Sequence, residues 1–176
     1  MIYQFDLPWD FTLFQTRVQH VIDKFPFSTW PNENWYSQIA LIYNDHNDCR
    51  LSDPGLELSQ YLTCWGLPLL KARISKTQSS GVWPAHRGWH ADEPMSQGIR
   101  IFIPVFDSDD SGIEMENMPP QPTPLGFGYT WNTSKLHRIW CKPGVSMQRI
   151  AVVIALKPNK IWNARQWAKY FQSFSI

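Results

Sequence analysis

The sequence lacks long hydrophobic runs and a strong charge of either sign. Its longest apolar run, Ile150 to Leu156, has the length of a strand and is too short for a membrane span. Sixteen lysines and arginines nearly balance fifteen aspartates and glutamates, which leaves a net charge of +1. No basic stripe points to nucleic acid or anionic lipid, so we expect no nucleic-acid partner and no membrane partner.

The sequence also lacks a signal peptide and paired cysteines. The opening residues MIYQFDLPWD carry two aspartates and have no basic region followed by an apolar run. Its three cysteines, Cys49, Cys64 and Cys141, are odd in number and widely spaced, which argues against a disulfide framework and a four-thiolate zinc site. We therefore expect a cytoplasmic protein whose cysteines are buried, reduced thiols.

The composition is that of a folded chain. Hydrophobic residues make up 43% and aromatic residues 15%, with ten tryptophans among 176 residues. This length predicts a single domain. Within it we expect an N-terminal helical and strand part (1–70) packed on a β core (71–157), followed by a C-terminal helix (158–176).

The first seventy residues carry mixed patterns. Apolar residues at helical spacing predict an amphipathic helix over Thr12 to Lys24, which Pro26 ends. Gln38 to Tyr43 has the composition of a strand, and Leu56 to Leu62 that of a short helix. At the other end of the chain, a helix is expected over Ile161 to Phe171.

From Lys71 the pattern becomes that of β structure, because segments rich in Ile, Val, Phe, Trp and Thr alternate with clusters of Pro, Gly, Ser and Asp. We predict seven strands: Lys71 to Gln78, Val82 to Trp89, Gly98 to Phe106, Gly112 to Glu116, Gly126 to Trp131, Leu136 to Cys141 and Met147 to Leu156. The fold class is therefore mainly β with flanking α, a sandwich or jelly roll with helices packed on one face.

One short motif has the chemistry of a metal site. His90 and Asp92 are two residues apart just after a predicted strand, and on an extended backbone their side chains point the same way. His137 follows 45 residues after Asp92, and Arg149 twelve residues after His137. Two histidines and one carboxylate on one face of a metal leave three positions open, which suits Fe(II) enzymes that activate O2.

A second His-x-Asp pair, His46 and Asp48, offers an alternative register with His90 and Arg100 as the later residues. The chain between Asp48 and His90 does not supply consecutive strands, and several strong strands after Arg100 would remain unplaced. We therefore interpret the His46 pair as a solvated turn.

In these residues the sequence resembles the Fe(II)- and 2-oxoglutarate-dependent oxygenases. The resemblance covers about Lys71 to Lys157 and implies a cupin-like double-stranded β-helix. It also implies that His90, Asp92 and His137 bind Fe(II), and that Arg149 holds the distal carboxylate of 2-oxoglutarate as co-substrate. The implied activity is hydroxylation of an amino-acid side chain or small metabolite, with release of succinate and CO2.

The spellings HRGWHADEP and WNTSKLHRIW look closest to the aspartyl/asparaginyl and prolyl hydroxylase-like branches of this superfamily. The role of Arg149 in binding a carboxylate also has a physical reason, because its strand is otherwise too apolar to tolerate an unpaired guanidinium.

Four further residues are candidates for the pocket. Arg100 alternates with isoleucines and shares a face with Phe102, so it can bind a substrate carboxylate if that face is the pocket. His86 lies four residues before His90, about 13 Å away along a strand, which favours a pocket or structural role over a ligand role. Trp89 and Trp131 are the remaining candidates.

Two rival functions stay open at this point. A cupin-like metal enzyme that does not use 2-oxoglutarate would have similar ligands, but in such an enzyme Arg149 would have no co-substrate to bind. A metal-free β-sandwich module that binds carbohydrate or protein is suggested by the ten tryptophans. Exposed, stacked tryptophans would favour this module, and buried ones would count against it.

Overall fold

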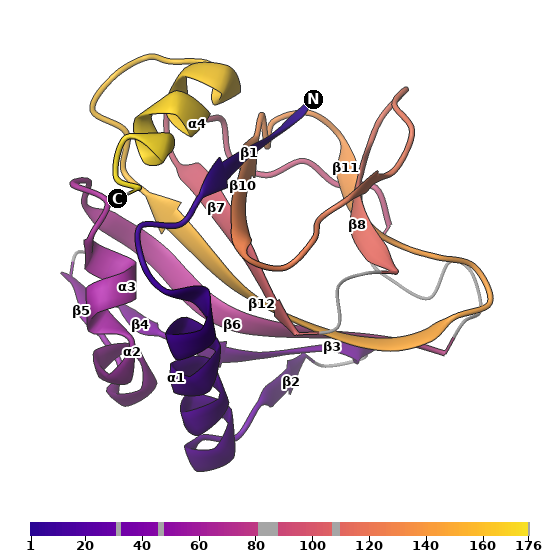
Figure 1. Cartoon of the computed structure of the whole chain (residues 1–176), viewed down its shortest axis with the longest axis horizontal. Helices are drawn as coiled ribbons and strands as arrows, with labels where there is room; N and C mark the ends of the chain where they lie inside the picture. Colours follow the sequence, from indigo (N-terminus) through magenta and orange to yellow (C-terminus); the bar gives the residue numbers. More distant parts are fainter. Residues whose placement is uncertain (31–32, 46–47, 81–87, 107–109, 176) are drawn as a thin grey trace.

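The computed structural model describes residues 1–30, 33–45, 48–80, 88–106 and 110–175. Two antiparallel sheets face each other (Figure 1). The major sheet has the order β1 (Ile2–Asp6), β10 (Phe127–Trp131), β7 (Ile99–Phe106), β12 (Ser146–Leu156), β6 (Leu69–Ser80), β3 (Glu33–Ala40) and β2 (Ser28–Trp30). The minor sheet has the order β11 (His137–Cys141), β8 (Ser111–Met115) and β9 (Gln121–Pro122).

The predicted fold class is confirmed: the chain is mainly β with flanking helices, and its sheets form a jelly roll of the double-stranded β-helix type. Six of the seven strands predicted after Lys71 are present. The seventh, Val82 to Trp89, falls mostly on residues outside the described part, and Gly88 and Trp89 themselves are not in a strand.

The N-terminal part differs from expectation in detail. The strand predicted over Gln38 to Tyr43 is divided at Leu41 between β3 and β4 (Ile42–Asp45), and β4 forms a hairpin with β5 (Asp48–Leu51). Leu41 is fully buried, and its carbonyl accepts a hydrogen bond from the Ser52 amide instead of continuing the sheet ladder. The helix predicted over Leu56 to Leu62 is two short helices, α2 (Asp53–Glu57) and α3 (Ser59–Thr63).

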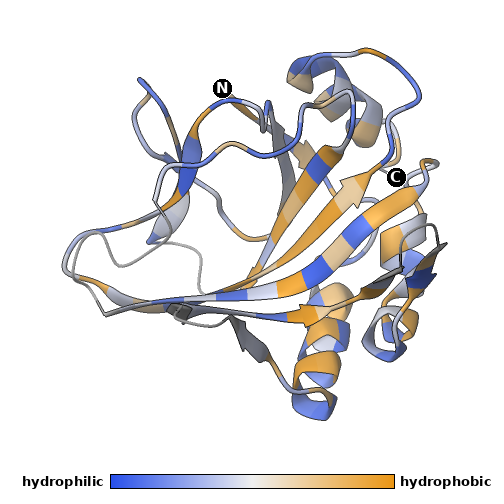
Figure 2. Cartoon of the chain, turned by 180° about the vertical axis from the view of Figure 1, so that it is seen from behind, coloured by the Kyte–Doolittle hydropathy of each residue, from blue (hydrophilic) through white to orange (hydrophobic). Residues whose placement is uncertain are grey.

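Helices cover the outer face of the major sheet. Helix α1 (Phe11–Lys24) begins at Asp10, whose side chain accepts a hydrogen bond from the Leu13 amide, and it buries Phe14, Val18 and Val21. Helices α1, α2 and α3 lie on one side of this sheet, and β8 and β11 lie on the other (Figure 1). Figure 2 shows mainly hydrophobic colouring along β12, whereas hydrophilic and hydrophobic residues alternate along the neighbouring β6.

Helix α4 (Ala164–Gln172) closes the fold at the end of the chain. Its first turn has a capping box, in which Asn163 and Gln166 each accept a hydrogen bond from the other's backbone amide. Phe171 is fully buried and packs against Phe5 of β1 and against Trp65, so the two ends of the chain share one apolar core.

Strand β12 separates this outer core from the space between the sheets. Ile150, Val152 and Ile154 belong to the core on the helical side. Ala151 belongs to a smaller core between the sheets, and Val153 packs against it. The side chains of this strand therefore alternate between the two faces of the sheet, and this alternation turns Arg149 toward the minor sheet.

The three cysteines are free, but only Cys141 is fully buried. Cys64 is half-buried, and burial raises the pKa of its thiol to about 12. The expectation of buried thiols is wrong for Cys49, which is exposed because it lies in the outer hairpin of β4 and β5. Among the described residues, none of the helices is long and apolar enough to cross a membrane.

The packing between α1 and the major sheet predicts that two neighbouring residues of α1 contribute very differently to the free energy of unfolding. Phe14 is fully buried against Trp9 and Tyr61, whereas 52% of Leu13 is exposed. Phe14→Ala should lower the free energy of unfolding by about 3–5 kcal/mol, because it removes an aromatic ring from a packed site. Leu13→Ala should change it by less than about 0.5 kcal/mol. Urea unfolding of both variants checks this, and equal effects would contradict the packing.

Candidate metal centre

Three candidate ligands are held by backbone hydrogen bonds between the segment after residue 88 and residues 133–137, which lead into β11 of the minor sheet. His90 and His137 exchange two backbone hydrogen bonds, with N···O distances of 3.1 and 2.9 Å. The Asp92 amide donates to the Thr133 carbonyl at 2.9 Å, and the Thr133 hydroxyl donates to the Glu93 carbonyl. These bonds bring a His-x-Asp pair and a histidine 45 residues later into one place.

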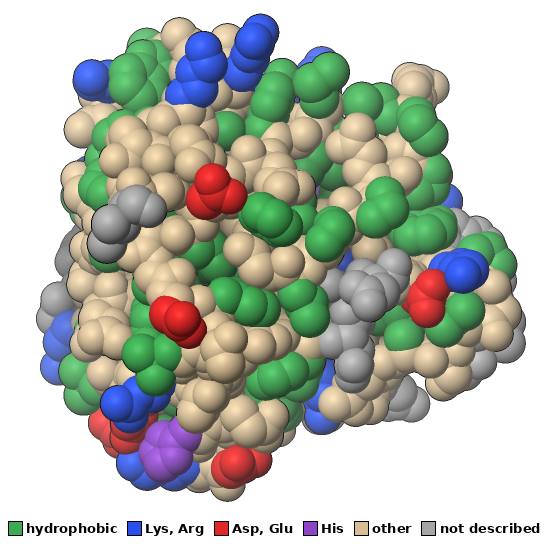
Figure 3. Space-filling view, viewed as in Figure 1, with side chains coloured by type: hydrophobic (Ala, Val, Ile, Leu, Met, Phe, Trp, Pro, Cys, Tyr) green, Lys and Arg blue, Asp and Glu red, His purple; other side chains and the backbone are tan. Residues whose placement is uncertain are grey.

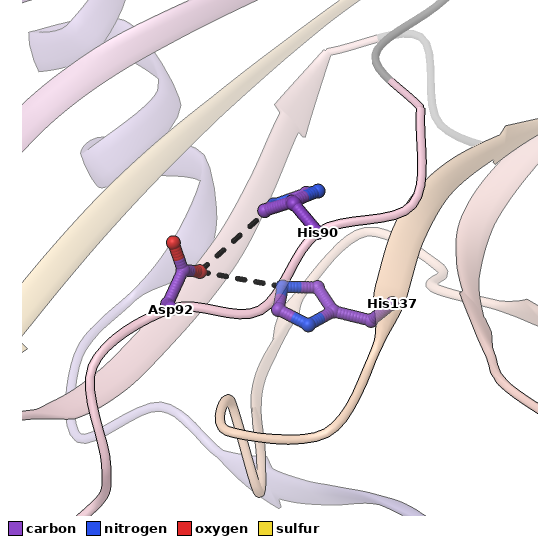
Figure 4. A group of neighbouring side chains, drawn as sticks. All are labelled: His90, Asp92 and His137. Atoms are coloured by element: carbon purple, nitrogen blue, oxygen red, sulfur yellow. Dashed lines mark ion pairs between the residues drawn. The ribbon is translucent and has the colours of Figure 1, made fainter.

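The three side chains converge as the spacing predicts. The distance from Asp92 Oδ2 is 3.3 Å to His137 Nε2 and 4.0 Å to His90 Nε2 (Figure 4). One potential ligand atom from each residue lies within 4.8 Å of those of the other two. The side chains of all three are mostly shielded from solvent.

Backbone carbonyls orient both imidazole rings. His137 Nδ1 lies 2.8 Å from the Lys135 carbonyl oxygen, and His90 Nδ1 lies 3.2 Å from that of Gly88. A carbonyl can only accept a hydrogen bond, so each Nδ1 carries a hydrogen. In the neutral form of each ring, Nε2 then has the lone pair that a metal needs. This arrangement, with the far nitrogen fixed by a carbonyl, is typical of metal-binding histidines.

The electrostatics of Asp92 fit a bound cation. Oδ2 is buried and accepts no well-aligned hydrogen bond, although Arg100 Nη1 lies 2.8 Å away. Burial by itself raises the pKa of Asp92, but His137 and Arg100 outweigh it and lower the pKa to about 2. The carboxylate is therefore ionised throughout the neutral range, and Oδ2, which pairs with Arg100, also faces both imidazole rings, where a metal ion would sit.

Arg149 enters the same space from β12. It is 1% exposed, and its Nη1 donates at 3.3 Å to the Ser111 hydroxyl and to the Gly112 carbonyl. Its guanidinium carbon lies 4.7 Å from the centre of the Phe102 ring. Among the residues that the structure describes, Arg149 has no carboxylate partner.

These groups line one pocket of about 580 Å³, a volume that includes its opening to solvent. Besides the three candidate ligands, its polar walls are formed by Tyr36, Arg73, Ser75, Arg100 and Arg149. Its apolar walls are Trp35, Phe102, Ile113, Trp131, Ile139 and Val153.

The other sequence candidates fall in different places. Arg100 and Trp131 line the pocket, and Arg100 pairs with Asp92 and with Glu93. Trp89 lies outside the pocket lining, 42% exposed, with the Arg138 guanidinium over its ring. His86 lies outside the described residues.

The structure describes only part of the alternative His-x-Asp pair, His46 and Asp48. His46 lies outside the described residues, and Asp48 stands opposite Asp45 in the hairpin of β4 and β5.

Sequence reasoning missed Arg73 and Ser75, although the polar alternation of Lys71, Arg73 and Ser75 against Ala72 and Ile74 was a signal for an inward polar face.

Comparison with solved structures agrees with this architecture. A 2OG-Fe(II) oxygenase family oxidoreductase from Burkholderia pseudomallei superposes with a TM-score of 0.61 at 12% identity, over 93% of this chain and 87% of that one. HygX from Streptomyces hygroscopicus, with nickel and 2-oxoglutarate bound, gives 0.60 at 10% identity, over 93% and 84%. The α-ketoglutarate-dependent epimerase SnoN from nogalamycin biosynthesis gives 0.59 at 10% identity, over 91% and 81%.

These similarities show that the chain has the fold of the 2OG-Fe(II) oxygenases, as the sequence resemblance implied. No protein-family model and no curated protein matches the sequence.

The convergence of the three side chains predicts the effect of removing one of them. His137→Ala should weaken Fe(II) binding by more than the roughly 10- to 100-fold that is typical when a residue that only orients a ligand is lost. His20→Ala, which changes an exposed histidine on α1, is the matched control and should bind as the wild type does. Anaerobic calorimetric titration measures both, with circular dichroism to check folding. Unchanged stoichiometry and affinity in His137→Ala would contradict the site.

Proposed function

We propose that the protein is a 2-oxoglutarate-dependent non-haem iron oxygenase. The observation that carries this proposal is the pairing, in one pocket, of two histidines and one carboxylate with a buried arginine that has no carboxylate partner among the described residues. The first group suits a metal that must keep open positions, and the second suits an anionic co-substrate.

His90, Asp92 and His137 would hold Fe(II) through two imidazole nitrogens and one carboxylate oxygen. This donor set suits Fe(II) that needs open positions for small ligands. When bound, Fe(II) with 2-oxoglutarate would supply the O2 activation that oxidises a substrate and releases succinate and CO2. The protein's contribution is to keep Asp92 ionised and to keep both rings in the tautomer that binds metal.

Arg149 would bind the distal carboxylate of 2-oxoglutarate. Burial lowers the pKa of its guanidinium to about 10, which leaves it protonated at neutral pH. A buried guanidinium needs an anion or a full set of acceptors, and Arg149 has one hydroxyl, one carbonyl and the face of Phe102. The Ser111 hydroxyl lies beside the guanidinium and can donate to the same carboxylate.

For the reaction we propose hydroxylation of an amino-acid side chain or a small metabolite. The solved structures of this fold include a Pseudomonas putida prolyl-4-hydroxylase, an epimerase and a carbocyclase, so the fold supports several oxidative outcomes. We further infer one domain, with residues 1–70 packed on the 71–157 core, and a location in the cytosol, where its free thiols would stay reduced.

The two rival functions are less well supported. A cupin-like enzyme without 2-oxoglutarate leaves the buried charge of Arg149 unexplained. A carbohydrate- or protein-binding module needs exposed tryptophans, but Trp65 and Trp167 are fully buried and Trp131 is 5% exposed. On the face that Figure 3 shows, acidic and basic side chains are scattered among apolar ones, without one continuous charged surface.

The proposal is tested by adding 2-oxoglutarate to the anaerobic Fe(II)-loaded protein. A visible absorption band should appear that needs both components, and O2 should then convert 2-oxoglutarate to succinate. The absence of the band with Fe(II) fully bound would overturn the use of 2-oxoglutarate and favour the cupin-like alternative.

The variant Arg149→Ala tests the binding of 2-oxoglutarate separately from the binding of the metal. It should raise the dissociation constant for 2-oxoglutarate at least about tenfold, because a charge-assisted contact is lost, while Fe(II) binding stays the same. Arg17→Ala, an exposed arginine on α1, is the matched control. Spectroscopic titration with 2-oxoglutarate measures the effect, and wild-type affinity in Arg149→Ala would refute the assigned role.

A further inference from the structure

A second group of positive side chains lies on the inward face of the major sheet. In the sheet register, Arg73 of β6 and Phe102 of β7 both stand opposite Val153 of β12. One step further along, Lys71 and Arg100 both stand opposite Ala155. Val153 and Ala155 are smaller than the side chains beside them, and together with Lys71, Arg73 and Arg100 they line a shallow hollow of about 210 Å³, a volume that includes its opening to solvent.

The charges around this hollow do not balance. Arg100 is paired twice, with Asp92 at 2.8 Å and with Glu93 at 2.9 Å. Lys71 lies 3.7 Å from Glu93. Two carboxylates therefore face three cations, and at least one positive charge is left over.

Arg73 carries the surplus charge. Within the described residues it makes no ion pair and no hydrogen bond through its side chain, and its Nε is buried without an acceptor. A guanidinium in this setting is stabilised by an anion that enters the pocket. The sequence offered Arg100 as an anchor for a substrate carboxylate, but in the structure Arg100 is already engaged by two carboxylates and Arg73 is not.

The position of Arg73 separates it from the proposed 2-oxoglutarate anchor. Arg149 stands opposite Thr77, four residues along β6 from Arg73, which corresponds to about 13 Å along the strand. Both arginines line the pocket that contains the three candidate ligands. One anion at Arg149 therefore leaves Arg73 available for a second anion on another side of the same site.

We propose that Arg73, with Lys71 beside it, binds a carboxylate of the substrate, so that the substrate is a small organic acid. This inference rests on the proposed function, because it assigns the substrate of that same pocket. A single carboxylate matches the one surplus charge that the protein's own residues leave, and its planar shape fits the fork of a guanidinium. Arg100 links the hollow to Asp92, so an acid held at Arg73 would lie next to the metal centre.

The experiment uses the full chain loaded with Ni(II) and 2-oxoglutarate, which does not turn over. Probes are matched pairs, each a small carboxylic acid and its primary amide, together with a set of phosphate monoesters. Binding is measured by thermal shift and calorimetry. In the wild-type protein the acids should bind more tightly than their amides, and Arg73→Gln should weaken acid binding about tenfold or more without affecting amides.

Two further variants serve as controls. Arg73→Lys keeps the charge and should retain part of the preference for acids, and Arg17→Gln removes an exposed charge from α1 and should retain all of it. Metal and 2-oxoglutarate affinities are measured on every variant. If those affinities are normal but the wild type shows no preference for acids, this inference fails and the proposed function stands.

Three other outcomes would also overturn the inference. The preference for acids could survive in Arg73→Gln. Phosphate monoesters could bind better than the carboxylic acids through Arg73. Arg73→Gln could weaken 2-oxoglutarate binding as much as Arg149→Ala does, which would make the co-substrate itself the partner of Arg73.

Discussion

Strand β12 lies between β6 and β7 at the centre of the major sheet, and its two-residue alternation determines the chemistry of both faces. Ile150, Val152 and Ile154 pack toward the helices. Arg149 and Val153 point into the pocket between the sheets. A shift of one residue in register would place a guanidinium in the apolar core, so this pairing is strongly favoured.

The pocket is consequently built from buried charges that depend on one another. Asp92 stays ionised because His137 and Arg100 outweigh the effect of burial on its pKa. Among the described residues Arg149 has no carboxylate partner, and it contacts the Ser111 hydroxyl, the Gly112 carbonyl and the ring of Phe102. Burying an unpaired guanidinium costs several kcal/mol, so such positions are understandable where the protein binds anions.

Strand β11 of the minor sheet and the segments that lead to it and to His90 position the candidate ligands. Reciprocal backbone bonds join His90 to His137, and the bond from the Asp92 amide to Thr133 sets the position of the carboxylate. The carbonyls of Gly88 and Lys135 then determine the tautomer of each ring. The site is therefore oriented by main-chain atoms, whose positions depend little on the identity of the surrounding side chains.

Much of this arrangement follows from the sequence alone, because it depends on local periodicity. The helical spacing before Pro26, the alternation of the strands after Lys71 and the His90-x-Asp92 pair are properties of short segments. The roles of His137 and Arg149 came from the order of these residues in the family that the sequence resembles. The edge strands β1, β2 and β9 were missed because they are short, and β1 in addition pairs with β10, which is distant in sequence.

Only the tertiary structure decided how the arginines are used. Arg73 and Arg100 have the same inward alternation in the sequence, and nothing local tells them apart. The segment before β7 brings Asp92 and Glu93 within reach of Arg100, whereas Arg73 makes an ion pair with neither carboxylate. Whether a charge is paired depends on contacts between residues far apart in the chain, and the sequence pattern does not contain those distances.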